Sequence, residues 1–259
     1  IKCGSYIGNG SATAGPEIYL GWEPSLILIK RTDSAANWEM YDSMRGITTD
    51  VSSGDKILRP NLSDAEIASS YRTNLTATGF IVNDNNTIVN ADGGSYIFLA
   101  IRRSDPLVQK PKSATELFAM DTGNGSNTIP AFDSGFPVDY GLLKEFAGNA
   151  SWYASSRLTG TKYLQTDNGN AEGTMNNWVF DSNVGWAWGS TSGYISYMWK
   201  RSAGFDVVAY KSPGGNNFAV NHSLGRIPEM MWIKRRGGSN NWTVYHKGLN
   251  NGTNPQNYG

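Results

Sequence analysis

A group of tryptophan, asparagine and aspartate residues in the second half of the chain has the composition of a sugar-binding surface. Trp186 and Trp188 lie two residues apart in a predicted strand, which would place both rings on one face, and Trp178 is close in sequence. Flat rings suit the C–H faces of sugars, and amide or carboxylate groups suit their hydroxyls. The polar candidates are Asn176, Asn177 and Asp181.

Burial in a hydrophobic core is the competing interpretation of these tryptophans, and the sequence favours it. Residues 185–188 (GWAW) match residues 79–82 (GFIV) of an earlier repeat, where Phe80 and Val82 stand at the tryptophan positions. Large aromatic side chains are most often buried. If Trp188 binds a sugar at the surface, Trp188→Ala should weaken glycan binding and leave the thermal midpoint nearly unchanged. If Trp188 lies in the core, the same change should lower the thermal midpoint strongly.

Residues suited to catalysis are few. The chain has two histidines, His222 and His246, and it contains neither GxSxG nor HExxH. Glu66 and Glu172 both follow alanine and are the candidate pair for glycosidic cleavage, but a helix-capping role explains Glu66 without chemistry. We therefore expect no catalytic residue, and a polysaccharide depolymerase is the least favoured hypothesis.

We also predict neither a metal site nor a cofactor. The single cysteine, Cys3, excludes a disulfide framework within the chain and a zinc site built on cysteines. Residues 121–124 (DTGN) and 167–170 (DNGN) are rich in oxygen, but they lack the spacing of an EF-hand loop and have the composition of ordinary turns.

The elements that position these residues occur three times. Residues 22–46 (WEPSLILIKRTDSAANWEMYDSMRG) indicate a turn, a buried strand, a polar turn and a second strand, and residues 136–160 and 227–250 repeat the pattern. The matching residues are the prolines Pro24, Pro137 and Pro228, the lysines Lys30, Lys144 and Lys234, and the tryptophans Trp38, Trp152 and Trp242. We expect these tryptophans to anchor the core of each unit, because an aromatic side chain buries a large apolar area.

The composition favours many short strands. Of 259 residues, 39% are hydrophobic and 17% are charged, and glycine (30), tyrosine (13) and tryptophan (9) are abundant, which suits strands joined by tight turns. A parallel sheet needs helical crossovers of about a dozen residues or more, for which there is no room. We predict an all-β fold of tandem antiparallel β-sandwich units, jelly-roll or lectin-like, with short helical turns.

The repeats predict unit 1 at residues 1–103, a linker at 104–115, unit 2 at 116–201 and a partial unit 3 at 205–259. A capping box at residues 63–66 (SDAE) predicts a short helical turn. The chain does not begin with Met, so we expect it to be a segment of a longer polypeptide.

Two further patterns concern the surfaces of the units. Residues 26–29 and 230–233 are apolar throughout, which predicts strands covered on both faces. Paired cations at 102–103 and 200–201 are either solvated strand ends or contacts that dock one unit onto the next. Because a partial unit cannot bury its apolar face alone, we expect self-association.

Nucleic-acid binding and membrane insertion are not expected. The formal net charge is zero, so no overall basic balance favours polyanions. The longest apolar runs, such as residues 97–101, are far shorter than the roughly 18 residues of a membrane span.

The repeats resemble a family of tandem-repeat virion proteins from marine bacteriophages, including cyanophages and pelagiphages. In unit 3 the similar stretches are residues 205–215 (FDVVAYKSPGG) and 222–247 (HSLGRIPEMMWIKRRGGSNNWTVYHK), and in unit 2 they are 136–144 (FPVDYGLLK) and 163–172 (YLQTDNGNAE). The resemblance covers nearly the whole chain. Residues 211–215 depart from it, because the family usually has TGNG there.

The resemblance implies a non-catalytic structural protein on the surface of a virion, in a tail fibre or similar appendage involved in host-cell attachment, with domains of unknown function. It implies association with itself, in a trimer as phage fibres commonly form, and with other virion proteins, and contact with a host cell-surface glycan. The alternative is a carbohydrate-binding module of a surface or secreted protein.

Overall fold

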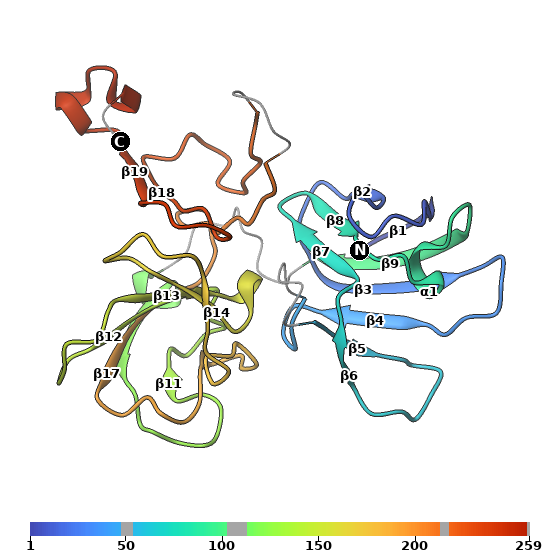
Figure 1. Cartoon of the computed structure of the whole chain (residues 1–259), viewed down its shortest axis with the longest axis horizontal. Helices are drawn as coiled ribbons and strands as arrows, with labels where there is room; N and C mark the ends of the chain where they lie inside the picture. Colours follow the sequence, from blue (N-terminus) through green and yellow to red (C-terminus); the bar gives the residue numbers. More distant parts are fainter. Residues whose placement is uncertain (48–53, 103–112, 213–217, 258–259) are drawn as a thin grey trace.

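A computed structural model describes residues 1–47, 54–102, 113–212 and 218–257. Arg103 and residues 104–112 of the predicted linker lie outside the described residues. The paired strands are antiparallel throughout, and the helices are single short turns. The predicted all-β, antiparallel sandwich fold is therefore confirmed (Figure 1).

Unit 1 is a sandwich of a large and a small sheet. The large sheet has the order β1-β9-β3-β4-β5-β6, and the small sheet has the order β2-β8-β7. The strands are β1 (Lys2–Ile7), β2 (Glu17–Tyr19), β3 (Pro24–Arg31), β4 (Glu39–Asp42), β5 (Asp55–Leu58), β6 (Ile67–Ser70), β7 (Thr73–Thr76), β8 (Gly79–Val82) and β9 (Ser95–Arg102). The helical turn α1 (Thr87–Asn90) precedes β9.

Unit 2 repeats the topology of the large sheet, and its small sheet has two strands where that of unit 1 has three. Its large sheet has the order β10-β17-β12-β13-β14-β15, which matches unit 1 strand for strand, and its small sheet pairs β11 with β16. The strands are β10 (Phe118–Thr122), β11 (Phe132–Asp133), β12 (Tyr140–Glu145), β13 (Tyr153–Ser156), β14 (Lys162–Gln165), β15 (Gly173–Thr174), β16 (Gly185–Trp186) and β17 (Tyr194–Trp199). The 3-10 turns are η1 (Ala114–Glu116) and η2 (Arg157–Thr159).

In unit 3 the described strands form one hairpin, β18 (Met230–Ile233) and β19 (Thr243–His246). The 3-10 turns η3 (Leu249–Gly252) and η4 (Pro255–Asn257) follow it. The side chains of β18 are all exposed, so the expectation of a strand covered on both faces is wrong here. In β3 the same expectation holds only in part, since Ile27 and Ile29 are buried while Leu26 and Leu28 are half-buried.

The three hairpins β3–β4, β12–β13 and β18–β19 have the same register. The pairs Ile29–Glu39, Leu143–Tyr153 and Ile233–Thr243 each lie directly before the repeated lysine and directly after the repeated tryptophan. The lysine closes the turn of its hairpin: the Nζ atom of Lys30 donates to the carbonyl of Ala36 (2.9 Å), and that of Lys144 donates to the carbonyl of Ala150. The spacing from lysine to tryptophan thus reflects one turn geometry.

Each core lies between the two sheets of its unit, and the two cores have different aromatic residues at the matching position. In unit 1, Phe80 of β8 meets Phe98 of β9 edge to face, at 5.6 Å between ring centroids. In unit 2, the larger Trp186 replaces Phe80 and its Nε1 atom donates to the Oγ atom of Ser196 at 3.0 Å. Gly141 leaves room for the indole, because a Cβ atom there would lie 2.3 Å from Cζ2 of Trp186.

The helical turn expected at residues 63–66 is absent, and this prediction was wrong. That stretch is irregular and leads into β6. Glu66 instead forms ion pairs with Arg45 (3.2 Å) and Lys56 (3.5 Å), which hold the segment extended. The described residues contain no helix long and apolar enough to cross a membrane.

Candidate ligand-binding site

Trp178 and Trp186 are core residues, 3% and 0% exposed. Trp178 packs edge to face against Tyr153 and Tyr163, with ring centroids 5.0 and 5.5 Å away. Trp186 stacks on Phe180 at 4.8 Å. Neither indole offers a free face to a sugar, so the core interpretation applies to both.

Trp188 lies on the surface, and the expectation that it shares a face with Trp186 is wrong. The strand β16 ends at Trp186, and Ala187 has a φ of +60°, so the strand alternation stops between the two rings. Trp188 is 37% exposed. Its backbone N–H donates to the carbonyl of Asn177 (2.9 Å), whose side chain donates to the carbonyl of Gly189 (3.4 Å).

Of the six predicted ligand-binding residues, the structure therefore brings together the exposed Trp188 and the half-buried Asn177. Asn176 and Asp181 are also exposed. One exposed ring beside amides is a small platform for a ligand.

The repeated tryptophans Trp38, Trp152 and Trp242 are half-buried and belong to neither core, so the prediction that they anchor the cores is wrong. The reason is strand parity. Glu39 and Tyr41 of β4 point inward, which leaves Trp38 on the opposite face. Trp152 instead packs against Tyr197 on the outer face of unit 2, with ring centroids 6.0 Å apart.

A cleft of about 140 Å³ lies between unit 2 and the hairpin β18–β19. Trp232 and Trp242 meet edge to face in it, with ring centroids 6.4 Å apart. Tyr140 and Tyr163 also line it. Figure 1 shows the hairpin beside β13 and β14. The remaining lining residues are Ala154, Ser155, Ser156, Thr159, Lys162, Leu164, Glu172, Val207, Val208, Ala209, Lys234 and Arg236.

Polar contacts at the rim hold the hairpin in place. Arg236 forms an ion pair with Glu172 at 2.6 Å, and the Nε1 atom of Trp242 donates to the carbonyl of Gln165 at 2.7 Å. Lys234 donates to the carbonyl of Gly169 at 3.3 Å. Burial lowers the pKa of Lys234 from its ordinary value, and the adjacent Arg235 lowers it further.

The cleft combines aromatic faces, hydroxyls and paired charges, which is the chemistry that recognises a polar ligand with apolar faces. The sequence reasoning missed Trp232, because it lies in an apolar run interpreted as a covered strand. It also assigned Trp242 to a core. The sequence carries no signal that β14 and β18 lie close together, because the cleft forms only when the hairpin β13–β14 and the hairpin β18–β19 pack against each other.

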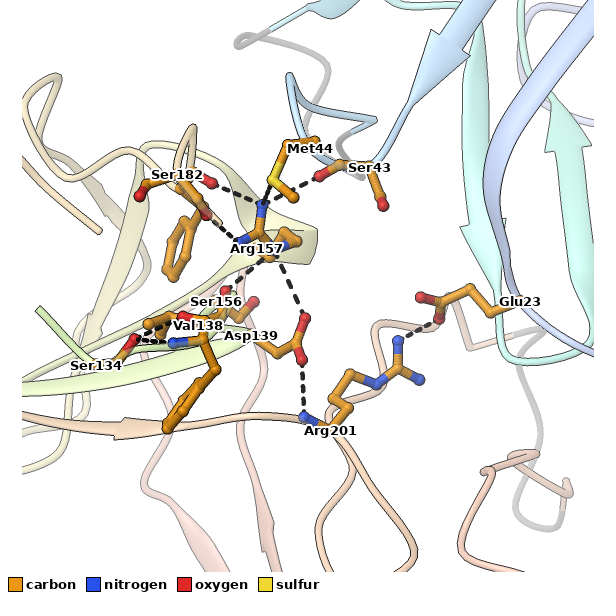
Figure 2. A network of polar contacts seen from close by, with 12 residues as sticks. Glu23, Ser43, Met44, Ser134, Val138, Asp139, Ser156, Arg157, Ser182 and Arg201 are labelled. Carbon is orange, nitrogen blue, oxygen red and sulfur yellow. Dashed lines mark hydrogen bonds and ion pairs between the residues drawn. The ribbon is translucent and has the colours of Figure 1, made fainter. Parts of the chain in front are cut away.

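A second polar site joins unit 2 to unit 1 (Figure 2). Arg201, which follows β17, is 2% exposed and forms ion pairs with Glu23 of unit 1 and, at 2.6 Å, with Asp206. Its backbone N–H donates to Asp139 at 2.7 Å. The guanidinium pKa is raised well above its ordinary value, because these carboxylates outweigh the effect of burial. The paired cations at 200–201 were interpreted as either a solvated strand end or a contact that docks one unit onto another. For Arg201 the second interpretation applies.

The turn η2 adds to the same junction. Arg157 donates to the carbonyl of Ser43 in unit 1 (3.2 Å) and to the carbonyl of Phe180 in unit 2 (2.6 Å). Leu158 is buried in the core of unit 1, although it belongs to unit 2. Units 1 and 2 thus share apolar packing as well as buried charge.

The residues considered for catalysis are dispersed or already paired. His222 and His246 are exposed, and the Nδ1 atom of each accepts a backbone N–H two residues later (3.3 and 3.1 Å). Glu66 and Glu172 are engaged in the ion pairs described above. Among the described residues, no group of three or more His, Cys, Asp and Glu side chains could hold a metal ion.

A family model described as "Domain of unknown function (DUF7483)" matches residues 1–104 and 154–257. The two matched segments cover most of the chain and are consistent with an internal repeat. No curated protein and no solved structure matches the chain.

Proposed function

Since the chain belongs to the DUF7483 family, whose description assigns no function, we propose its role from its sequence and architecture. It is a non-catalytic structural protein of a bacteriophage virion, part of a tail fibre or similar appendage on the particle surface, and takes part in host-cell attachment. Its partners are further copies of itself, in a trimer, and other virion proteins. The sequence resemblance described above supports the phage assignment.

The observation that carries this proposal is the buried junction between two units whose large sheets have the same strand order. An elongated appendage keeps its parts at fixed positions along its length, so its units need a defined relative orientation. The ion pairs of Arg201 with Glu23 and Asp206 have little access to water. Buried, directional charge pairs favour one arrangement over others, even where they add little net stability.

Immuno-electron microscopy of phage particles with antibodies against the 259-residue chain tests this proposal. We expect label along a tail or fibre. Protein found only in the soluble fraction of the lysate, with unlabelled particles, would reject a virion role. Release of reducing ends from host polysaccharide by the purified chain would reject the non-catalytic assignment and support a depolymerase.

The second candidate is a carbohydrate-binding function, as in a module of a surface or secreted protein, and the cleft beside β18 favours it. Trp232 is 47% exposed within a wall that also carries charged and hydroxyl groups. Aromatic rings next to hydrogen-bonding groups are suited to sugars.

A glycan array probed with the labelled chain tests this candidate. Trp242→Phe keeps an aromatic ring in the cleft, and Trp188→Ala removes the separate surface ring. We expect Trp242→Phe to weaken glycan binding and Trp188→Ala to leave it unchanged. The opposite order would move the site to Trp188 and Asn177, and absence of any bound glycan would reject the candidate.

A further inference from the structure

The cleft between unit 2 and the hairpin β18–β19 is lined by more cations than carboxylates. Its charged lining residues are Lys162, Lys234, Arg236 and Glu172. Arg236 and Glu172 offset each other in their ion pair at 2.6 Å. The other two are lysines, one at the start of β14 and one directly after β18, so the lining has an excess of positive charge. A cleft lined by one sign of charge attracts ligands of the opposite sign.

Lys234 is the cation of this cleft that is bonded to neutral acceptors. Its Nζ atom donates to the carbonyls of Arg235 (3.0 Å), Gly169 (3.3 Å) and Gly238 (3.4 Å). In the described part of the chain, Lys234 takes part in no ion pair. Burial and the neighbouring Arg235 both lower the pKa of Lys234. An anion in the cleft would offset both effects, because an opposite charge favours the charged form of an amine.

Two tryptophans provide the aromatic walls of the cleft. The rings of Trp232 and Trp242 stand at 79° to each other, and Trp232 is 47% exposed. The bond from Nε1 of Trp242 to the carbonyl of Gln165 fixes the second ring. The volume of about 140 Å³ is close to the roughly 150 Å³ of a cavity that holds one benzene ring. The cleft therefore suits a single six-membered ring.

The cleft lies on the face of the hairpin that points away from the core side. Met231 has the hairpin position of Ile27, which is buried in the core of unit 1. Trp232 is the next residue along β18, so its side chain projects to the opposite face. Apolar packing over Met231 would therefore leave Trp232 in the cleft.

We propose that this cleft binds one sugar ring with an anionic substituent, a carboxylate or a sulfate, with the ring on Trp232 and the anion near Lys234. The inference rests on the carbohydrate-binding candidate described above and adds the charge of the ligand to it. A neutral sugar could use the aromatic walls equally well, but it would leave the excess positive charge of the lining without a counter-charge.

Calorimetric titration of the 259-residue chain with D-glucose, D-glucuronate and D-glucose 6-sulfate tests the proposal, because the three sugars differ only at C6. We expect at least one acidic sugar to bind about tenfold or more tightly than glucose. The tighter of the two acidic sugars identifies the anion. Raising NaCl from about 0.05 M to about 0.5 M should weaken acidic-sugar binding several-fold and leave glucose binding unchanged.

Removal of single cations locates the anion. Lys234→Gln should weaken acidic-sugar binding by about tenfold and change glucose binding by less than about twofold. Lys162→Gln removes a charge from the unit 2 side of the cleft and gives a second measurement if Lys234→Gln disturbs the hairpin. Lys2→Gln is the matched control, because it changes the net charge equally at an exposed position of unit 1. It should leave binding unchanged.

Equal affinity for the three sugars would overturn the proposal and leave the carbohydrate-binding candidate standing. Absence of binding tighter than about 50 mM for all three would also overturn it, and the glycan array would then decide separately whether the chain binds any sugar. If Lys2→Gln weakened binding as much as Lys234→Gln, the attraction would be to net charge and the cleft would not be the site. None of these results bears on the appendage role, which immuno-electron microscopy tests.

Discussion

Arg201, at the end of unit 2, forms an ion pair with Glu23, which directly precedes β3 in unit 1, although the two residues are 178 positions apart in the sequence. The Nε atom of Arg201 forms a second ion pair, with the carboxylate of Asp206, at 2.6 Å. The last cation of one unit therefore fixes the position of its neighbour. Such a junction couples the stabilities of the two units.

Replacing Arg201 with methionine should destabilise this junction strongly. The change removes the cation and leaves Glu23 and Asp206 without their main counter-charge, which typically costs about 3–5 kcal/mol. Urea unfolding followed by tryptophan fluorescence measures the loss. The exposed Arg235→Ala is the matched control and should change stability by less than about 0.5 kcal/mol. A similar small effect for both variants would contradict a structural role for the junction.

A methyl group at Gly141 should not be tolerated. Its Cβ atom would lie 2.3 Å from Trp186, which has no room to move in the core, so we expect Gly141→Ala to cost about 1–3 kcal/mol or more. Gly204→Ala is the control, because no atom lies within 4 Å of a Cβ there. Thermal unfolding of both variants makes the comparison. Equal midpoints would mean that Trp186 does not pack on Gly141.

Trp186 and Trp188 should respond in opposite ways to alanine. Trp186→Ala leaves a large cavity and loses the bond to Ser196, so the free energy of unfolding should fall by about 3–5 kcal/mol. Trp188→Ala removes a partly exposed ring and should cost about 1 kcal/mol or less. Chemical denaturation gives both values. A larger loss for Trp188 would refute the burial order described above.

The repeated lysines should contribute separately to their hairpins. Lys30→Met and Lys144→Met each remove a charged bond to a turn carbonyl, which is worth about 1.5–3 kcal/mol. Because the two turns lie in different units, the losses should add within about 0.5 kcal/mol in the double variant. Denaturation of the single and double variants tests this. Strong non-additivity would argue against independent turn clamps.

Stability should fall at alkaline pH because of buried tyrosines. Burial raises the pKa of Tyr6 well above its ordinary value, and its hydroxyl donates to the carbonyl of Val89 at 2.7 Å. The unfolded chain loses this proton near pH 10, whereas the folded chain keeps it. The contribution is thus complete below about pH 10 and is lost progressively above it, by about 1.4 kcal/mol per pH unit for one phenol.

Urea unfolding between pH 8 and pH 11 measures this slope. Tyr6→Phe should make it shallower by about one proton, or about 1.4 kcal/mol per pH unit. The unchanged chain is the reference for this slope. An identical slope in Tyr6→Phe and in the unchanged chain would show that Tyr6 titrates in the folded chain as it does in the unfolded one.

The candidate site was predictable only in part. Trp188 is exposed, as the sugar hypothesis requires, and the half-buried Asn177 is bonded to it, but the positive φ of Ala187 separates Trp188 from Trp186. Such a backbone reversal leaves no signal in the alternation of residue types. The cleft that contains Trp232 and Trp242 brings together segments about 70 residues apart, as the bond from Trp242 to Gln165 spans 77 positions.

The amino-acid sequence by itself determined the all-β class, the repeated hairpins and their common register. These features depend on near neighbours: strand periodicity, turn residues and the spacing from each lysine to its tryptophan. The tertiary structure decided which aromatic residues are buried, and it placed Arg201 against Glu23. Burial depends on what distant segments pack above a residue, and that is settled only when the sheets and units come together.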